Sequence, residues 1–386
     1  MTVTLFSVIT SILLCNVYIT SIALMRRHNE FILRFSLIPL ALLIVAGIFR
    51  MVFVIEFPST IVIGSEVILP AIINFLSIEL FPVYSGNITI HIYDLLLGIW
   101  IIGSIYNFHK YFHQSIKLYS SFHSLPSTHD MQIITCMNEV LAENHKNMNM
   151  NIKIIKSEEI IIPMITGYFK PVICLPDIQF SDDELKNILL HECTHFLHKD
   201  AWVKLFVYLI SVVFWWNPFV HILKQELNHI LEIQCDLSIT SKMNEESRVN
   251  YLESILKIIK SSRKSALPQP IPMNCAALVS TNKTKKIEQR FALVLGYDSD
   301  KTQRIFQVIL LCSMILLSFL ASYKIVIQPR YQPIAEAGYE ETFTITPENS
   351  YLTANENGTY SLYADGIYRF DISEIDEEPF SSLPIK

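Results

Sequence analysis

Residues 191–200 read HECTHFLHKD, and this stretch decides what kind of domain the chain contains. His191 and His195 are separated by one helical turn, so on a helix both imidazoles project from the same face. Both can therefore reach one zinc ion at about 2.0–2.1 Å. Glu192 lies beside the first ligand, where it can act as general base on the water that the metal activates. The spacing predicts a zinc hydrolase site, against the alternative of a surface helix with incidental histidines.

A catalytic zinc needs a third protein ligand and one open position. Downstream, residues 226–240 read ELNHILEIQCDLSIT, which places Glu232 and Asp236 on one face of a helix. Glu232 can complete a two-histidine, one-glutamate site, and Asp236 can orient a ligand imidazole by accepting its hydrogen bond. Glu226 on the same helix is a rival third ligand, or else a solvated helix charge.

Other residues near these motifs have weaker claims on the site. Asp200 can orient a ligand or merely end its helix. His229 can donate a proton or stabilise the transition state, or it is an ordinary helix histidine. His198 is expected to face solvent. Cys193 and Cys235 flank motif residues, but buried cysteines usually serve packing.

The composition places the motif in a membrane protein. Of 386 residues, 51% are hydrophobic and only 17% are charged, whereas soluble domains are about a quarter charged. Four apolar stretches approach the ~20 residues that cross a bilayer; they cover about residues 5–24, 36–55, 92–108 and 305–327. Arg50 interrupts the second stretch and marks either a buried ion pair or a boundary residue. The predicted fold is a multi-pass α-helical membrane protein.

Basic residues predict how these stretches are oriented. Arg26, Arg27 and Arg34 lie between the first two stretches, whereas residues 51–109 contain no lysine or arginine. Because loops rich in lysine and arginine stay in the cytoplasm, we expect the first loop to lie inside. The same rule divides the chain into three spans with an external loop at 57–91 (residues 1–108), a cytoplasmic domain (109–304), a fourth span (305–327) and a short acidic external tail (328–386).

A fifth apolar stretch at residues 201–220, AWVKLFVYLISVVFWWNPFV, is long enough to cross the membrane. If it crossed, Glu232 would lie on the opposite side from His191 and His195, and the three could not share a metal. We therefore expect a membrane-associated helix that turns back near residues 215–218 (WWNP), since proline ends a helix.

The pattern of residues 109–304 is α+β. A capping box of Ser181 and Glu184 opens the helix that carries the histidines. Upstream of it, the pattern predicts a helix at about 131–144 and short strands at 152–155, 160–165 and 171–175.

Several segments in order resemble the BlaR/MecR family of membrane metallopeptidases, the antirepressor proteases of β-lactam resistance. They are FRMVFVIEFPST (49–60), LLLGIWIIGS (95–104), IPMITGYFKPVICLP (162–176), LLHECTHFLHKD (189–200), FWWNPFVHILKQELNHILEIQCD (214–236) and NKTKKIEQRFALVL (282–295). The resemblance covers roughly residues 1–327. It implies a cytoplasmic α+β gluzincin-like zinc peptidase domain in a bacterial plasma membrane protein. It also implies one zinc ion per chain, held by His191, His195 and Glu232, with Glu192 as the catalytic base.

The resemblance extends to substrate and partners. It implies that Pro163, Gly167 and Pro171 flank an edge strand lining the substrate cleft, and such a strand can hold an extended peptide by β-augmentation. A cytoplasmic BlaI-like winged-helix repressor is the expected substrate, with the protease itself as a second one. A homodimer in the lipid bilayer is an expected assembly. The net charge of −6 predicts no direct contact with nucleic acid.

One departure from the family pattern and two alternative functions need to be stated. Family sensors carry an external penicillin-binding domain with a serine and a lysine three residues on, but residues 328–386 contain no SxxK. We therefore expect no acylation by a β-lactam, and only a hairpin or small module there. A quality-control protease of the HtpX or CAAX-prenyl-protease kind would share the histidine motif, but residues 162–176 and 282–295 favour the first family. A non-catalytic receptor with a structural zinc would have no use for Glu192.

Overall fold

The computed structural model describes most of the chain, which divides into two compact units. The described residues are 4–55, 57, 60–82, 89–144, 152–264, 276–277, 284–297, 302–330, 345–355, 359–373, 375 and 379–386. The first unit is Met1–Pro329 and the second is Arg330–Lys386.

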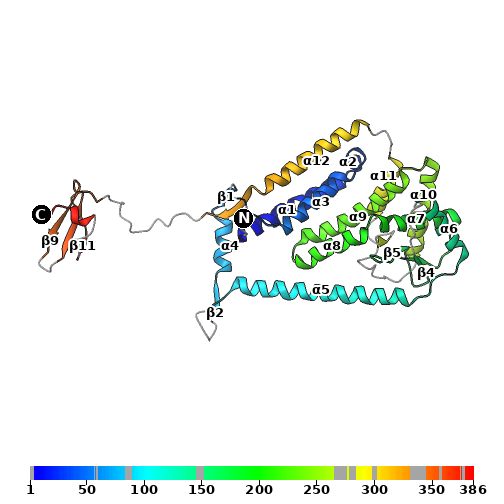
Figure 1. Cartoon of the computed structure of the whole chain (residues 1–386), viewed down its shortest axis with the longest axis horizontal. Coiled ribbons are helices and arrows are strands. Elements are labelled where there is room, and N and C mark those ends of the chain that lie inside the picture. The colour runs from blue at the N-terminus through cyan, green and yellow to red at the C-terminus, as the bar shows by residue number, and fades with distance from the viewer. Residues whose placement is uncertain are drawn as a thin grey trace. The chain divides into compact units, whose positions relative to one another are not determined.

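Apolar helices form one layer of the first unit. Helix α1 (Leu5–Arg26) packs against α3 (Ile38–Val52), and α12 (Thr302–Ser322) packs on α3; Figure 1 shows the three side by side. Among the described residues, α1 and α12 are long and apolar enough to span a membrane. The short helix α2 (Asn29–Phe35) meets α3 at a bend of 96°, so these two can form a third span only as a broken pair.

Arg50 is a buried charge within this layer of apolar helices. A charge in such surroundings needs polar or charged partners. Its guanidinium is buried, donates to the Ser11 hydroxyl and lies 4.4 Å from the centre of the Tyr323 ring. It makes no ion pair with a described carboxylate, so the predicted ion pair is not found in the described part of the chain, and a position at the membrane boundary stays a prediction.

The third predicted span is part of a much longer helix. Helix α5 (Ile92–Ser124) has 33 residues and continues well past the predicted limit at residue 108. It packs against α8, and it is not among the described helices that meet the length and hydropathy criteria for a span. Crossing by residues 92–108 therefore stays a prediction.

The loop at 57–91 and the end of α12 come together in a small sheet. Strand β1 (Ile61–Ser65) pairs in parallel with β8 (Ile325–Pro329), with Ile61 opposite Ile325. The predicted fourth span was therefore too long, because residues 325–327 form a strand instead of continuing the helix. Between β1 and α5 lie α4 (Ile68–Leu76), β2 (Glu79–Pro82) and β3 (Thr89–His91).

A mixed sheet with helices around it follows α5. Its strand order is β4-β6-β5-β7, and β4 and β6 are parallel. The strands are β4 (Lys153–Ser157), β5 (Met164–Thr166), β6 (Val172–Pro176) and β7 (Ala276–Ala277). The accompanying helices are α6 (Met131–Asn144), α7 (Asp182–Leu197), α10 (Glu245–Lys264) and α11 (Thr284–Leu295). The helix predicted at 131–144 is found with the same bounds.

Helix α7 begins at the predicted capping box. The Ser181 hydroxyl accepts from the backbone of Glu184, and the Glu184 carboxylate accepts from the backbone of Ser181 at 2.7 Å. Three acidic residues in the first turn favour the positive end of the helix dipole. The buried face then carries Leu185, Ile188 and Leu189 into the core, and it continues directly into the histidine motif.

The fifth apolar stretch forms a hairpin rather than one long helix. Helix α8 (Asp200–Val213) has 14 residues, about 21 Å, which is too short for ~30 Å of hydrocarbon. Helix α9 (Pro218–Thr240) packs back against it. Asn217 caps α9 through Phe219 N, and its amide nitrogen donates to Asn16 of α1 at 2.9 Å. The chain thus reverses within the predicted residues 215–218.

The second unit is a small sheet. Strands β9 (Ser350–Ala354), β10 (Tyr360–Ala364) and β11 (Ile367–Ile372) are antiparallel in the order β11-β10-β9. Leu352, Leu362 and Leu383 form its core. This agrees with the small module predicted from the alternating pattern of the tail.

The predicted orientation can be tested at two exposed positions. A membrane-impermeant thiol reagent should label Ser381→Cys in intact cells, because the tail is predicted to lie outside. Lys242→Cys, just after α9, should be labelled only after permeabilisation. The unsubstituted chain gives the background from its own cysteines. Labelling of Ser381→Cys only after permeabilisation would show that the predicted orientation is wrong.

Candidate metal centre

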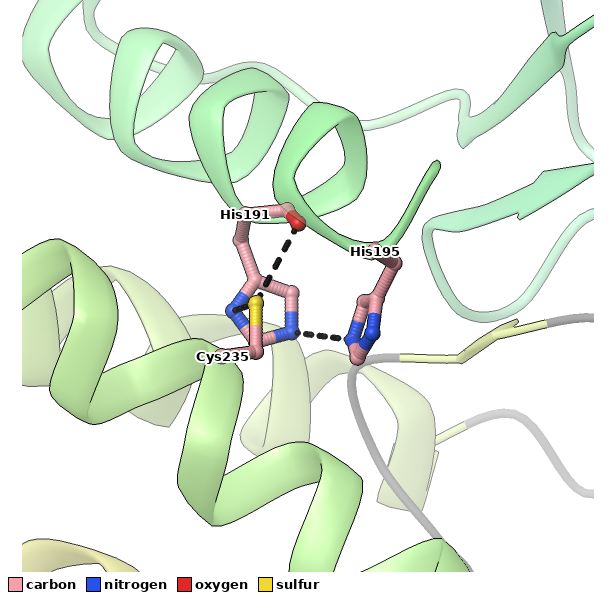
Figure 2. A group of neighbouring side chains, drawn as sticks. All are labelled: His191, His195 and Cys235. Atoms are coloured by element: carbon pink, nitrogen blue, oxygen red, sulfur yellow. Dashed lines mark hydrogen bonds between the residues drawn. The ribbon is translucent and has the colours of Figure 1, made fainter. Parts of the chain in front are cut away.

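Two imidazoles on α7 face each other in the interior. His191 and His195 are both buried, and their Nε2 atoms are 3.1 Å apart. Figure 2 shows the two rings projecting from consecutive turns of the helix toward a common point. The two imidazoles therefore project from the same face of α7, as the spacing of four residues predicted.

The neighbours of the two rings decide which nitrogens carry hydrogen. His195 Nδ1 donates to the Asp200 carboxylate at 2.5 Å, so it is protonated. His191 Nδ1 lies 2.8 Å from the Tyr251 hydroxyl, which itself donates to Asp236 at 2.7 Å and so must accept from His191. When both rings are neutral, their Nε2 atoms therefore present lone pairs to each other. Two lone pairs at this distance repel unless a shared cation lies against both.

Glu232 on α9 completes the group. Its carboxylate oxygens lie 3.6 Å from His191 Nε2 and 3.6 Å from His195 Nε2. Ligands bound at about 2.0–2.1 Å to one tetrahedral zinc lie roughly 3.3 Å apart, so these separations fit a single ion. Burial alone would raise the pKa of Glu232, but neighbouring groups, among them the Arg290 guanidinium, hold it below its ordinary value.

The buried charges around the imidazoles do not balance. Each of six charged groups is less than 10% exposed; they are Glu192, Asp200, Glu232, Asp236, Lys204 and Arg290. When all six are ionised, the four carboxylates exceed the two cations by two negative charges. Uncompensated buried charge costs several kcal/mol per ion. A divalent cation against the two Nε2 lone pairs and Glu232 would compensate for this excess, so the residues present fit a zinc ion.

Cys235 lies close to His191, but its thiol faces the Nδ1 side of that ring and not the Nε2 side that meets His195 and Glu232. Its thiol approaches His191 Nδ1 at 3.5 Å and the His191 carbonyl oxygen at 3.4 Å, as Figure 2 shows. His191, His195 and Cys235 could be grouped as metal donors by distance. However, His191 Nδ1 is already engaged by Tyr251, and burial raises the pKa of the Cys235 thiol well above its ordinary value. Cys235 therefore packs against the ligand helix, as the sequence suggested.

Glu192 is fully buried beside the histidines. Neither carboxylate oxygen has a hydrogen-bond partner of ordinary geometry in the described part of the chain. Burial and then the charge of Glu232 raise the pKa of Glu192 well above its ordinary value, and Lys204 of α8 offsets part of this. Buried polar groups without partners are rare and often mark functional positions. Glu192 is thus a buried acidic group that no described side chain hydrogen-bonds.

Arg290 and Tyr251 belong to the centre but were missed in the sequence. Arg290 on α11 donates to both oxygens of Asp236, at 2.6 and 2.8 Å, and lies 3.2 Å from Glu232. It therefore holds two acidic residues of α9 in place. Asp236 reaches His191 chiefly through the Tyr251 hydroxyl, so its predicted role in orienting an imidazole is largely indirect.

Comparison with known sequences shows which family the chain is similar to. A sequence model of the family described as BlaR1 peptidase M56 matches residues 2–294, three quarters of the chain. The chain belongs to this family. The matched range contains every residue of the centre, and it confirms the resemblance drawn from the motifs.

Among similar proteins is the Regulatory protein BlaR1 of Bacillus licheniformis, 27% identical over 288 residues, which covers 69% of this chain and 45% of that protein. The Methicillin resistance mecR1 protein of Staphylococcus aureus is 28% identical over 299 residues, covering 71% of this chain and 47% of that protein. The chain thus spans less than half the length of these relatives. It is a member of a family of membrane metallopeptidases of signal transduction.

Three other residues that the sequence analysis weighed for this M56 peptidase lie outside the centre. Glu226 is neither a ligand nor a solvated charge: it is buried and forms an ion pair with Arg26 of α1. His229 is buried and bonds Gln289 at 3.0 Å, so it does not face the imidazoles. His198 was expected to face solvent, and it is partly buried at the end of α7.

The predicted substrate edge also needs correction. Pro163 and Gly167 flank β5, and Pro171 precedes β6, as expected from the motif. Gly167 has φ +101°, and a Cβ there would meet the Lys170 carbonyl at 2.2 Å, so only glycine fits. However, β5 is not an edge strand, because β7 pairs with its outer side. The strand next to α7 is thus already covered by the chain's own Ala276–Ala277.

The Tyr251 hydroxyl gives a direct test of this centre. Tyr251→Phe should bind zinc about 10–100-fold more weakly, because His191 loses the group that fixes its ring. Chelator competition on the purified protein measures this, with the exposed Tyr106→Phe as the control. A Tyr251→Phe protein that competes for zinc as well as the wild type would contradict the proposed orientation of His191.

Proposed function

We propose that this M56 peptidase is an integral-membrane zinc endopeptidase with one zinc ion per chain. His191, His195 and Glu232 are its ligands, and Glu192 is its general base. One observation carries the proposal: two imidazole lone pairs and one carboxylate converge with separations of 3.1–3.6 Å beside an unpartnered buried carboxylate. This is the donor set and the base of a gluzincin-type hydrolase.

The chemistry follows from the residues around the ligands. When bound, zinc supplies Lewis-acid polarisation of the scissile carbonyl and an activated water. The Glu192 carboxylate accepts a proton from the attacking water and then returns it to the leaving amine nitrogen. The positive charge of Lys204 lowers the pKa of Glu192 and so favours the ionised carboxylate. Asp200 and Tyr251 keep the two imidazoles in the tautomer that leaves Nε2 free.

The proposed substrate is a cytoplasmic BlaI-like winged-helix repressor. The peptidase domain that cleaves it is residues 109–304, which we place on the inner side of a bacterial membrane. Two relatives of this chain are named as a regulatory protein and a methicillin resistance protein, which supports a role in regulated resistance. The family model matched is that of a BlaR1 peptidase, so we do not favour a quality-control protease. Homodimerisation stays a prediction.

Self-cleavage is a second proposed reaction. Ala276–Ala277 pairs with β5 in the antiparallel manner of an extended peptide bound by β-augmentation. The same two residues lie next to α7, which carries the histidines. The chain therefore presents its own backbone at the strand where a substrate peptide would lie.

The ligand assignment predicts metal content. Glu232→Ala should lose most of its zinc, because two imidazoles alone leave the site without its anionic ligand. Glu253→Ala, an exposed glutamate on α10, should keep a full equivalent. Elemental analysis of both purified proteins measures the difference. Full zinc in Glu232→Ala would exclude Glu232 as a ligand.

The assignment of Glu192 predicts a separation of binding from catalysis. Glu192→Gln should retain zinc but cut several orders of magnitude more slowly, since each ~1.4 kcal/mol of lost stabilisation costs tenfold in rate. Mass spectrometry of a co-expressed repressor, taken from beside the protease in its genome, gives the cleavage rate. Near wild-type cleavage by Glu192→Gln would refute its hydrolytic role, whereas loss of zinc would place Glu192 among the ligands.

A further inference from the structure

The end of the first membrane helix is buried inside the peptidase domain. Arg26, in the last turn of α1, is 6% exposed and forms an ion pair with Glu226 of α9. A second nitrogen of the same guanidinium reaches the other Glu226 oxygen at 3.2 Å. A buried guanidinium is tolerated only when it is paired and hydrogen-bonded. The position of the α1 end is therefore tied to α9, the helix that carries Glu232.

A third helix is attached at the same point. Gln289 of α11 accepts from Arg26 at 2.8 Å and donates to the Arg26 backbone carbonyl at 2.8 Å. Its carbonyl oxygen also accepts from His229 at 3.0 Å, which uses both of its lone pairs and fixes the orientation of the amide. Gln289 thus binds the end of α1 through both the oxygen and the nitrogen of its side-chain amide.

The next residue along α11 is Arg290, which holds the metal centre. Arg290 bonds both oxygens of Asp236 and contacts Glu232. Neighbouring residues on a helix point in directions about 100° apart, so α11 contacts the α1 end with one side chain and the acidic residues of α9 with the next. If α1 moves relative to α9, α11 must either release Gln289 or carry Arg290 with it.

We propose that Arg26 and Gln289 are positioning residues for the zinc ligand Glu232. They fix α11 so that Arg290 holds Glu232 and Asp236 at the distance the metal requires, and they make that placement depend on the end of the first membrane helix. The inference rests on the proposed zinc function, and it adds a route by which an event in the membrane reaches the centre. Neither residue touches the metal or the substrate.

Zinc affinity of the full chain in detergent tests this proposal. Gln289→Met keeps the volume of the side chain but loses both hydrogen bonds to Arg26, and it should bind zinc about tenfold more weakly in chelator competition. Glu288→Met places the same side chain on the exposed side of α11 and should bind zinc as the wild type does. Thermal unfolding without metal reports separately on folding.

A second comparison distinguishes positioning from general loosening. If Gln289 acts through Arg290, the double variant Gln289→Met, Arg290→Lys should lose no more zinc affinity than Arg290→Lys alone. Fully additive losses overturn the proposal, and so does a folded Gln289→Met protein with wild-type affinity.

Two controls complete the test. If Gln289→Met does not fold, Arg26→Lys decides in its place: an ammonium can still pair with Glu226 but lacks the second arm that reaches Gln289, so only the bond from Gln289 to the residue 26 backbone carbonyl remains and zinc affinity should still fall. Wild-type affinity in a folded Arg26→Lys protein then overturns the proposal. Unchanged zinc affinity in Glu232→Ala would show instead that the proposed ligand set is wrong, so the two failures are distinguishable.

Discussion

The set of buried charged groups around the two imidazoles is the constraint on which the rest of this structure depends. Four carboxylates and two cations lie buried around the two imidazoles, and when all six are ionised the excess of negative charge needs a counterion. The groups come from α7, α8, α9 and α11, and Tyr251 of α10 joins them. No single helix could bring this set together, so the centre exists only when these helices pack as one body. Metal affinity and the stability of the domain are for this reason linked quantities.

The membrane-facing part of the fold is arranged around the same requirement. Glu232 must return to the side of α7, and a crossing helix at residues 201–220 would prevent this. Helix α8 stops after 14 residues, and Asn217 both caps α9 and bonds α1. An apolar stretch that resembles a span is thus used as one half of a hairpin. Its hydrophobicity serves packing against neighbouring helices, and contact of its exposed side chains with lipid stays a prediction.

What the sequence could predict follows the range of the interactions. The geometry of His191, Glu192 and His195 is set within one helical turn, and the capping box that opens α7 is equally local. Choosing between Glu232 and Glu226 is harder, because the pattern of α9 does not say which face meets α7 and which meets Arg26. Tyr251 and Arg290 follow Asp236 by many residues, and no spacing rule connects them. The predicted edge strand was wrong because β7 is only two residues long, Ala276–Ala277, and two alanines carry no strand signal.

The start of α1 is anchored as firmly as its end. The Thr10 hydroxyl accepts from the backbone of Ile327 at 3.0 Å, in the strand β8 that leads into the tail. Its last turn carries Arg26. Between these anchors lie four to five turns of helix, about 24 Å at 1.5 Å per residue. A helix resists stretching because backbone hydrogen bonds connect its successive turns. Helix α1 is therefore a stiff connection between strand β8 and the peptidase domain. Helix α1 thus connects β8 at Thr10 with α9 at Arg26 along its own length.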